Sequence, residues 1–344
     1  MRFLITGGAG FLGINLCRYL KERGHYVRSL DTAPFDYPDR RDYDVRTGDV
    51  RDKAAVSNAM NNIDVCVHAA MALPLYDEKD IRSVGVEGTR NVLDAAIEND
   101  VKRVVFVSST AVYGIPKHHP LIESDVLQGV GPYGEAKIEA EMLCLAYRQN
   151  GLVIPILRPK TFIGPERLGV FAIYFDWVRR GKHVPIIGDG KNKYQLLDVD
   201  DLCQAILLAA TKPASKANDT FNIGAGWVRT MNEDFGVVLR YAGTGRHLVP
   251  LPATPTIWTL RILEALKLSP LYKWVYETAS VDSYVSIEKA QKQLGYRPRY
   301  STAEALLRNY KWYILSSHAH NAATGISHRQ PWKQGILRVV SWFF

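Results

Sequence analysis

Short apolar runs alternate with longer amphipathic stretches along the first half of the chain. The apolar runs predict strands, at residues 2–6, 26–30, 64–68, 103–107 and 153–157. The stretches between them have helical spacing of apolar residues and predict helices, at 11–23, 52–61, 84–99 and 133–149. Because nearly continuous apolar strands that alternate with helices form parallel sheets covered on both faces, we predict an α/β fold with a doubly wound parallel sheet.

The pattern is looser after about residue 160, where proline and glycine become frequent. Further helices are predicted at 170–180, 200–211, 232–242, 256–267 and 302–315. The helix at 256–267 either caps an apolar cleft or packs in the core, and the core is the simpler interpretation. Residues 316–330 are small and polar and predict a linker, followed by an apolar and basic segment at 331–344.

A glycine-rich loop, TGGAGFLG at 6–13, follows the first predicted strand and opens the first helix. Gly7 permits a tight turn, Gly10 lets the backbone approach a pyrophosphate, and Gly13 lets helix and strand pack closely. The N-terminus of the helix offers unpaired N–H groups and the positive end of its dipole to a phosphate. The loop therefore predicts a dinucleotide-binding site.

The nature of the dinucleotide depends on Asp31, at the end of the second predicted strand. A carboxylate there accepts hydrogen bonds from the hydroxyls of the adenosine ribose and repels a 2′-phosphate. Thr32 and Ala33 follow, and no arginine stands beside them to hold such a phosphate. We therefore expect NAD rather than NADP as the cofactor, although a turn residue at the end of a strand is the alternative interpretation of Asp31.

Candidate reacting groups lie further along the chain. Tyr133 and Lys137 are four residues apart on a helix that Pro132 opens, so the phenol and the ammonium share a face. We expect the nearby cation to lower the pKa of Tyr133 towards neutrality, where the phenol serves as acid or base. Ser109 follows the strand at 103–107, at the edge where parallel sheets bind ligands. These three residues predict one catalytic site.

Together, these motifs resemble those of the extended short-chain dehydrogenases/reductases, the NAD-dependent epimerase/dehydratase superfamily. The resemblance covers about residues 1–313. Its motifs are, in chain order, TGGAGFLG at 6–13, Asp31, Gly48-Asp49-Val50, His68-Ala69-Ala70, Gly88-Thr89-Arg90-Asn91-Val92, Ser108-Ser109, Tyr113-Gly114, Tyr133 with Lys137, Arg158-Pro159, Gly188-Asp189-Gly190, Val199-Asp200-Asp201, and Lys289 with Leu294-Gly295-Tyr296-Arg297-Pro298.

The resemblance implies roles for individual residues. Tyr133 would exchange a proton with the substrate, Lys137 would bind the nicotinamide ribose, and Ser109 would hydrogen-bond the substrate oxygen. Asp49 would lie near the adenine, His68-Ala69-Ala70 would line the pyrophosphate side, and Pro159 would shape the nicotinamide pocket. The cofactor-binding residues expected are Gly7, Gly10, Phe11, Leu12, Gly13, Asp31, Asp49, Val50, His68, Ala69, Ala70, Tyr133, Lys137 and Pro159. No metal site is expected.

The resemblance also implies a division into domains. We expect an NAD-binding Rossmann domain at 1–165, to which a segment near 190–225 returns. A smaller α/β substrate-binding region would follow at 166–315, and the family is commonly dimeric, so a homodimer is expected.

Departures from the family pattern narrow the chemistry. Sugar 4,6-dehydratases carry Asp-Glu where this chain has Thr110-Ala111, and nucleotide-sugar decarboxylases use a Glu where Ala111 stands. Nucleotide-sugar enzymes usually have Asn at the position of Thr161 and Arg-Asp at the position of Tyr194-Gln195, to hold a diphosphate. Without these ligands, a nucleotide sugar would need other cations, such as Arg167, Lys191 or Lys193.

These departures, with Gly85 where the family often has Asn, resemble the 3β-hydroxysteroid dehydrogenase-like branch. The function predicted is NAD(P)-dependent interconversion of a secondary alcohol and a ketone on a hydrophobic, lipid- or sterol-like substrate. The alternative is an NAD-dependent nucleotide-sugar 4-epimerase, and a third possibility is a cofactor-binding scaffold without turnover.

The net positive charge of the chain is concentrated near its C-terminal end. The 344 residues carry 43 Lys+Arg against 35 Asp+Glu, a net charge of +8. Five of the cations follow Glu304, beyond which no acid occurs, so subtracting them leaves +3 for the first 304 residues. Because the surplus is not spread over a folded domain, we expect no nucleic-acid partner. Four cysteines without paired spacing and no signal peptide favour the cytoplasm.

The last segment, 331–344, has apolar residues on one helical face, at Trp332, Ile336, Val339, Val340 and Phe343. With its basic residues, it predicts an amphipathic helix on anionic lipid, at the inner face of a membrane. The alternative is a tail that packs against its own domain or against a dimer partner. No run of 18 apolar residues occurs, so no transmembrane helix is expected.

Overall fold

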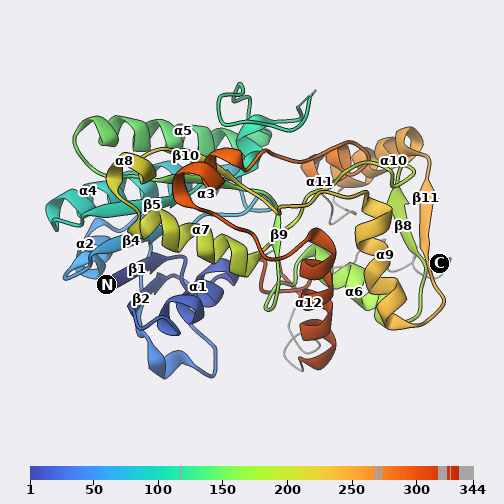
Figure 1. The fold of residues 1–344 in the computed structure, drawn as a ribbon, viewed down its shortest axis with the longest axis horizontal. Coiled ribbons are helices and arrows are strands. Elements are labelled where there is room, and N and C mark those ends of the chain that lie inside the picture. The colour runs from blue at the N-terminus through green and yellow to red at the C-terminus, as the bar shows by residue number, and fades with distance from the viewer. Residues whose placement is uncertain are drawn as a thin grey trace.

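In the computed structural model, which describes residues 1–116, 118–266, 268, 271, 273–316, 324–325 and 327–332, parallel strands form a seven-stranded central sheet (Figure 1). The strand order is β10–β6–β5–β4–β1–β2–β3. The strands are β1 (Arg2–Thr6), β2 (Tyr26–Asp31), β3 (Asp44–Thr47), β4 (Val65–His68), β5 (Arg103–Val107), β6 (Ile156–Pro159) and β10 (Thr220–Ile223). The order reverses between β1 and β4, as in a Rossmann sheet, and this confirms the predicted fold class.

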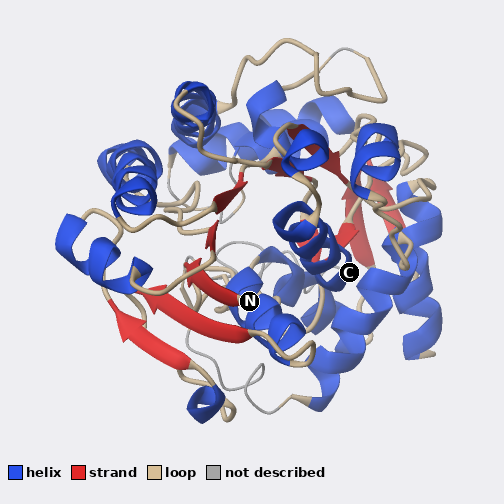
Figure 2. Ribbon diagram, turned by 60° about the vertical axis from the view of Figure 1, so that its left-hand side comes forward, coloured by secondary structure: helices blue, strands red, loops and turns tan. Residues whose placement is uncertain are grey.

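Helices cover both faces of this sheet (Figure 2). Within β1, Phe3 and Ile5 pack on one face with α1 (Phe11–Lys21) and α7 (Val199–Thr211). Leu4 points to the other face and packs with the second set of helices, which are α2 (Lys53–Met60), α4 (Gly88–Glu98) and α5 (Gly131–Gln149). Successive side chains of a strand alternate between faces, so a continuous apolar strand is buried on both sides.

In the first half of the chain, three elements differ most from the prediction. Strand β3 was not predicted, because the edge strand Asp44–Thr47 has no apolar run. Strand β6 begins at Ile156 rather than at 153, since Val153 makes only an isolated bridge to Arg103. The helix expected at 84–99 consists of α3 (Glu78–Arg82), a π-helical turn at Ser83–Glu87, and α4.

A second, smaller region lies at the carboxyl ends of the strands. Its core joins α6 (Val170–Arg179), α9 (Met231–Ala242) and α12 (Thr302–Leu315). It also contains two pairs of parallel strands, β8 (Val184–Ile187) with β11 (Leu248–Leu251) and β7 (Phe162–Ile163) with β9 (Leu197–Asp198). The remaining helices are α8 (Ala214–Ala217), α10 (Ala253–Ala265) and α11 (Lys273–Thr278).

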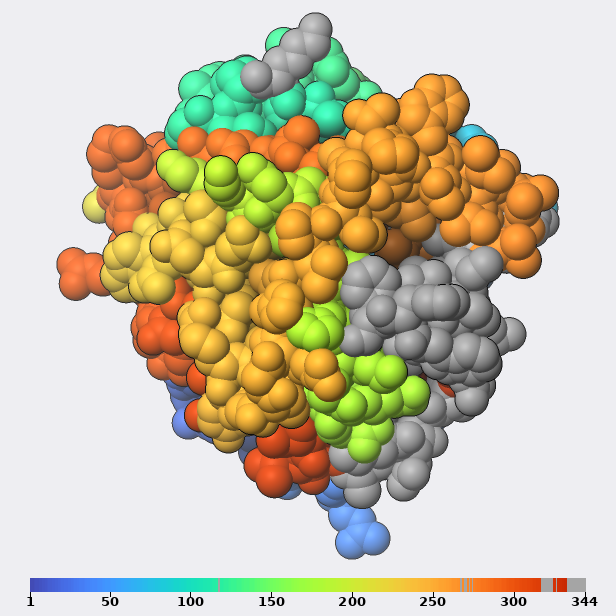
Figure 3. Space-filling model, turned by 90° about the vertical axis from the view of Figure 1, so that its right-hand side faces the viewer, coloured from blue at the N-terminus to red at the C-terminus, as the bar shows by residue number. Residues whose placement is uncertain are grey.

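Helix α10 corrects the interpretation of 256–267 as core. Of the residues of α10, only Leu260 is buried, whereas Trp258 is 59% exposed. Leu266, the C-cap of α10, is 61% exposed. In Figure 3, the part of the chain that contains α10 and α11 is drawn in orange and lies at the surface. The apolar spacing of this helix therefore does not mark a core element.

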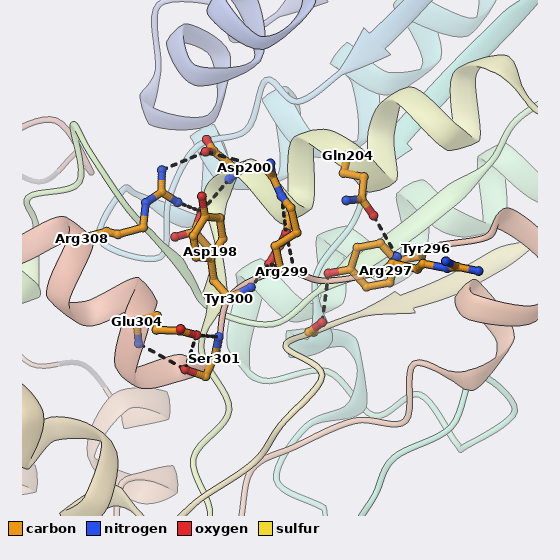
Figure 4. Close-up of polar contacts among 12 residues, drawn as sticks. Asp198, Asp200, Gln204, Tyr296, Arg297, Arg299, Tyr300, Ser301, Glu304 and Arg308 are labelled. Carbon is orange, nitrogen blue, oxygen red and sulfur yellow. Dashed lines mark hydrogen bonds and ion pairs between the residues drawn. The ribbon is translucent and has the colours of Figure 1, made fainter.

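The motif at 289–298 has a structural role. The Tyr296 hydroxyl donates to the carbonyl oxygen of Gly224 at 3.0 Å, and the N–H of Arg299 donates to Asp201 of α7 at 2.9 Å (Figure 4). Ser301 and Glu304 then form a capping box that begins α12. Arg308 of α12 reaches Asp198 and Asp200 at the start of α7. The contacts fasten α12 to α7 and so to the large sheet.

The predicted linker at 316–330 contacts the folded body at its C-terminal end. The N–H of Leu168 donates to the carbonyl oxygen of His328 at 2.9 Å, and the N–H of Gly169 donates to that of Gln330 at 3.0 Å. Trp332, which we placed on a lipid-facing side, is 5% exposed and packs in the core of α6, α9 and α12 instead. Residues 333–344 lie outside the described residues, so the amphipathic helix stays a prediction. No described helix is long and apolar enough to cross a membrane.

Candidate active site

Two neighbouring cavities open at the carboxyl ends of the strands. The first, which we call the cofactor cleft, has a volume of about 680 Å³ and runs along the loops after β1, β2 and β4. The second, which we call the substrate cavity, has a volume of about 770 Å³ and lies between the loops after β5 and β6 and the smaller region. Tyr133 lines both, so it stands where the two cavities meet.

The glycine-rich loop forms one end of the cofactor cleft. Gly7 has φ +74°, and a Cβ there would lie 2.9 Å from the backbone of Ala70. A Cβ on Gly13 would lie 2.4 Å from the carbonyl oxygen of Gly7, so only glycine permits this packing. Gly10 is the N-cap of α1 without a side-chain hydrogen bond, and Phe11 and Leu12 line the cleft. The backbone at the start of α1 thus fits a phosphate group.

Asp31 lies at the next position along the cleft. Its Oδ2 accepts a hydrogen bond from the N–H of Ala9 and its Oδ1 from the N–H of Ala33, both at 2.9 Å. Asp49 and Val50 also line the cleft, and Asp49 forms an ion pair with Arg51 at 2.6 Å. The Arg51 side chain holds the pKa of Asp49 below its usual value. A ribose next to Asp31 and an adenine next to Asp49 fit these positions.

His68 is placed behind the cleft, which corrects its expected position in the wall. Ala69 and Ala70 line the cleft, but His68 is buried, with its Nδ1 2.7 Å from the hydroxyl of Thr6 and its Nε2 3.0 Å from that of Thr89. Burial lowers the pKa of His68 to about 3, so the ring is neutral. It joins β4 to β1 and α4 and supports the backbone of Ala69-Ala70.

The three candidate catalytic residues come from β5 and α5. Ser109 follows β5, and its hydroxyl accepts a hydrogen bond from the N–H of Ala111 at 3.1 Å. The Tyr133 phenol is in the first turn of α5, close enough to Ser109 for the serine side chain to favour the phenolate and so to lower the pKa of Tyr133. Lys137 is buried one turn later, and its Nζ donates to the carbonyl oxygen of Val107 at 2.7 Å. Ser109 and Tyr133 both line the substrate cavity, whereas Lys137 lines the cofactor cleft.

The electrostatics of Tyr133 differ from the expectation. Burial raises its pKa to about 12, while the hydrogen bond from Ser109 and the charge of Arg167 act in the opposite direction. Lys137 does not contribute, because its amine is held by Val107, and burial lowers the pKa of Lys137 to about 8. The cation that lowers the pKa of Tyr133 is therefore Arg167. The sequence suggested Arg167 only as a ligand for a diphosphate.

The substrate cavity shows what replaces the expected diphosphate ligands. Burial raises the pKa of the Tyr194 phenol, while the nearby side chains of Thr278 and Thr161 act in the opposite direction. Gln195 is buried, and its side chain bonds the backbone of Ala225 and Val285. The two positions at which nucleotide-sugar enzymes bind a diphosphate are thus Thr161 and Tyr194, and here their side chains lie close to each other. Pro159, expected near the nicotinamide, also lines this cavity.

Much of the remaining wall is aromatic or aliphatic. These residues are Phe162, Val170, Phe171, Tyr174, Met231, Phe235, Val275 and Trp332. Of the cations considered for a diphosphate, Arg167 lines the cavity, whereas neither Lys191 nor Lys193 is among its lining residues. An apolar wall with few polar groups fits a hydrophobic ligand.

Sequence reasoning missed Lys160. It is 3% exposed, lines the substrate cavity, and its Nζ donates to the hydroxyl of Ser283 at 2.7 Å. Burial lowers its pKa to about 7. Its position directly after Arg158-Pro159 is the only signal in the sequence, because Ser283 is more than a hundred residues away.

The chain is similar to several known proteins along most of its length. The model of the NAD dependent epimerase/dehydratase family matches residues 3–224. An uncharacterized protein of Sinorhizobium fredii, y4nG, is 37% identical over 98% of this chain and 85% of its own length. A 3 beta-hydroxysteroid dehydrogenase/Delta 5→4-isomerase of Mycobacterium tuberculosis is 29% identical over 91% of this chain and 90% of its own.

Among solved structures, that of a UDP-glucose 4-epimerase from Thermotoga maritima superimposes with a TM-score of 0.76. It is 26% identical, and the match covers 92% of this chain and 99% of that one. The relatives therefore include both a steroid dehydrogenase and a sugar epimerase.

Proposed function

The chain belongs to the NAD-dependent epimerase/dehydratase family, and we propose that it interconverts a secondary alcohol and a ketone on a hydrophobic, lipid- or sterol-like substrate. The observation that carries this proposal is the wall of the substrate cavity, which is largely aromatic and aliphatic. Thr161 and Tyr194 line this cavity at the two positions that would hold a nucleotide diphosphate, and neither side chain carries a positive charge. The 3 beta-hydroxysteroid dehydrogenase/isomerase among the relatives supports the same substrate class.

The backbone that lines the cofactor cleft has the features that a dinucleotide needs. The close approach at Gly7 and Gly13 leaves no room for side chains, and the start of α1 has no capping side chain. We assign the phosphates to this loop and the adenosine ribose to Asp31. A ribose hydroxyl needs an acceptor there, whereas a 2′-phosphate would meet the negative charge of Asp31, so we propose NAD as the preferred cofactor. NAD bound by these residues would supply the hydride acceptor for the alcohol and, as NADH, the hydride donor for the ketone.

Tyr133 and Ser109 hold the oxygen of the substrate in this proposal. When a ketone is reduced, the Tyr133 phenol donates its proton to the developing alkoxide oxygen, and Ser109 hydrogen-bonds the same oxygen. A pKa of about 12 keeps the phenol protonated at neutral pH, which suits this direction. In the opposite direction, Tyr133 accepts the proton of the alcohol, and the Arg167 charge and the Ser109 hydrogen bond favour its phenolate.

A second candidate function is an NAD-dependent nucleotide-sugar 4-epimerase. The Thermotoga maritima enzyme supports it, and so do two cations that line the substrate cavity, Lys160 and Arg167. A diphosphate bound between them would have its charge compensated without the usual ligands.

One set of assays separates the two candidates. Purified protein is incubated with NAD or NADH and a panel of hydroxysteroids, oxosteroids and long-chain hydroxy and oxo compounds, and the NADH absorbance is followed. In parallel, UDP-sugars are incubated without added reductant, and 4-epimers are sought by chromatography. We expect NADH-coupled turnover of a hydrophobic compound; rapid epimerisation of a UDP-sugar would overturn the proposal in favour of the second candidate.

A further inference from the structure

A C-terminal segment, Ser327–Trp332, crosses from the smaller region to the cofactor cleft, and we call it the strap. It runs beside Leu168-Gly169, whose two N–H groups donate to carbonyl oxygens of the strap. In return, the N–H of Trp332 donates to the carbonyl oxygen of Gly169 at 3.4 Å. Pro331 and Gly169 form a parallel bridge. The strap is thus attached by backbone hydrogen bonds to the loop that precedes α6.

Trp332 anchors one end of the strap. Its side chain is buried in the cluster that contains Phe175 of α6 and Tyr313 of α12. Gly169 has φ +58°, and a Cβ there would lie 3.6 Å from the indole nitrogen of Trp332. The ring therefore packs directly on this glycine, and burying a tryptophan gives the strap a firm attachment.

Arg329 reaches the opposite wall of the cleft. Its Nη1 donates to the carbonyl oxygen of Pro34 at 3.3 Å, and its guanidinium carbon lies 4.6 Å from the centre of the Tyr37 ring. Pro34 follows Asp31 by three residues, and both line the cleft. The strap therefore bridges the smaller region and the Rossmann sheet, and Ser327, His328, Arg329 and Gln330 all line the cofactor cleft.

The charges that line the cofactor cleft single out Arg329. Two other cations line it, Arg51 and Lys137. Arg51 forms ion pairs with Asp49 and Asp80 at 2.6 and 3.0 Å, and the Lys137 amine is bonded to a carbonyl oxygen inside the fold. Within the part of the chain that the structure describes, no carboxylate forms an ion pair with Arg329. Its guanidinium stays available to an anion that enters the cleft.

We propose that Arg329 binds a phosphate of the dinucleotide, and that the strap closes over the bound cofactor and retains it. This inference rests only on the dinucleotide binding in the proposed function, and not on the substrate. A guanidinium matches the geometry of phosphate oxygens, and the start of α1, which lines the same cleft, supplies N–H donors. Because Asp31 opposes a 2′-phosphate, we assign the diphosphate common to NAD and NADP as the group that Arg329 contacts.

The test measures binding directly. Protein freed of nucleotide is titrated with NADH and with NADPH, by fluorescence and by calorimetry, as wild type, Arg329→Ala and Arg329→Lys. Loss of a charge-assisted contact weakens the affinity of Arg329→Ala for NADH by about 10- to 100-fold, with a smaller effect in Arg329→Lys. Lys292→Ala, which removes an exposed cation that does not line the cleft, serves as the matched control and keeps wild-type affinity.

A second variant tests the strap as a whole. Trp332→Ala removes the anchor, and stopped-flow displacement of NADH should then show faster dissociation, while thermal melting of the nucleotide-free protein shows whether the fold persists. If Trp332→Ala does not fold, the dissociation rate is measured on Arg329→Ala alone, where an increase is likewise expected.

Each result has a defined meaning. Unchanged NADH and NADPH affinities in Arg329→Ala would overturn the inference. A loss confined to NADPH would overturn the diphosphate assignment and show that Arg329 reads a 2′-phosphate. Wild-type protein that binds NADH but turns over no substrate in the panel would count against the proposed function and leave the strap intact; wild-type protein that binds neither nucleotide would overturn both.

Discussion

Tyr133 is among the residues that line both cavities, and its surroundings set its proton chemistry. Burial favours the neutral phenol, while a serine hydroxyl and a guanidinium favour the phenolate. These opposing effects suit a group that must both give and take a proton. The buried amine of Lys137, which the sequence would pair with the phenol, is bonded to the end of β5 instead.

Replacing Tyr133 should separate catalysis from cofactor binding. We expect Tyr133→Phe to lower the turnover of the hydrophobic substrate by about 10²- to 10⁴-fold, the range for a general acid or base, with nearly unchanged NADH affinity. Steady-state kinetics and fluorescence titration measure the two quantities. Tyr241→Phe, at an exposed tyrosine of α9, is the control; full activity in Tyr133→Phe would contradict the assigned role.

Lys160 illustrates how burial makes stability depend on pH. Its pKa is about 7 in the folded protein and near the usual lysine value in the unfolded chain, so between these values only the unfolded chain holds the proton. Stability therefore rises with pH across this window, and the cost of the buried charge is greatest below about pH 7. Lys160 has no ion pair within the described residues to offset that cost.

Lys160→Met should remove this dependence. We expect the variant to be more stable than the wild type below about pH 7, with a difference that shrinks towards pH 10. Urea unfolding at both ends of this range measures the difference. Lys191→Met, at an exposed lysine, should show no such trend, and a Lys160→Met variant that is less stable at low pH would refute the explanation.

At the scale of elements, the attachment of α12 to α7 holds the smaller region against the sheet. The Asp198 carboxylate is fully buried, and burial raises its pKa to about 6 even though Arg308 pairs with it (Figure 4). Asp198 also caps α7 through the N–H of Asp200 at 2.9 Å. The ion pairs of Arg308 with Asp198 and Asp200 therefore connect the start of α7 with the middle of α12.

Breaking this pair should destabilise the fold. Arg308→Met leaves the charge of Asp198 buried without its partner, and we expect a loss of about 2–4 kcal/mol in the free energy of unfolding, because Arg308 itself is partly exposed. Adding Asp198→Asn to this variant should recover part of the loss, since the amide still caps α7. Denaturant unfolding checks both, with Lys311→Met on the same helix as the control; equal stability of Arg308→Met and wild type would contradict this account.

Several elements were predicted with nearly their observed limits, and the exceptions share a cause. Strands β1, β2 and β5 and helices α1, α6, α7, α9 and α12 follow from local periodicity. Strand β3 was not predicted, because this edge strand is polar. Helix α10 was predicted, but its apolar residues are largely exposed rather than packed in the core. Periodicity reports burial on one face, so it fails where an element forms without such burial.

At the scale of the whole molecule, two groups of expectations stay predictions. The homodimer is one, and the contact of the segment 331–344 with anionic lipid is the other, since residues 333–344 of that segment lie outside the described chain. Arg329 is one of the cations that make up the surplus of positive charge near the C-terminus, and it lines the cofactor cleft. Part of the basicity that suggested a membrane thus belongs to a candidate ligand of the cofactor.

The sequence by itself determined the Rossmann sheet, the phosphate loop and the line of candidate residues from Gly7 to Lys137, because each depends on neighbours within a few positions of the chain. Only the tertiary structure decided that Tyr194 lies close to Thr161, that His68 lies behind the cleft, and that Arg329 lies beside Pro34. Along the chain, Thr161 and Tyr194 are 33 positions apart. His68 and its partner Thr6 are 62 positions apart, and Pro34 and Arg329 are 295 positions apart. Such contacts form when whole elements pack, and no local pattern of polarity specifies which distant side chain will arrive.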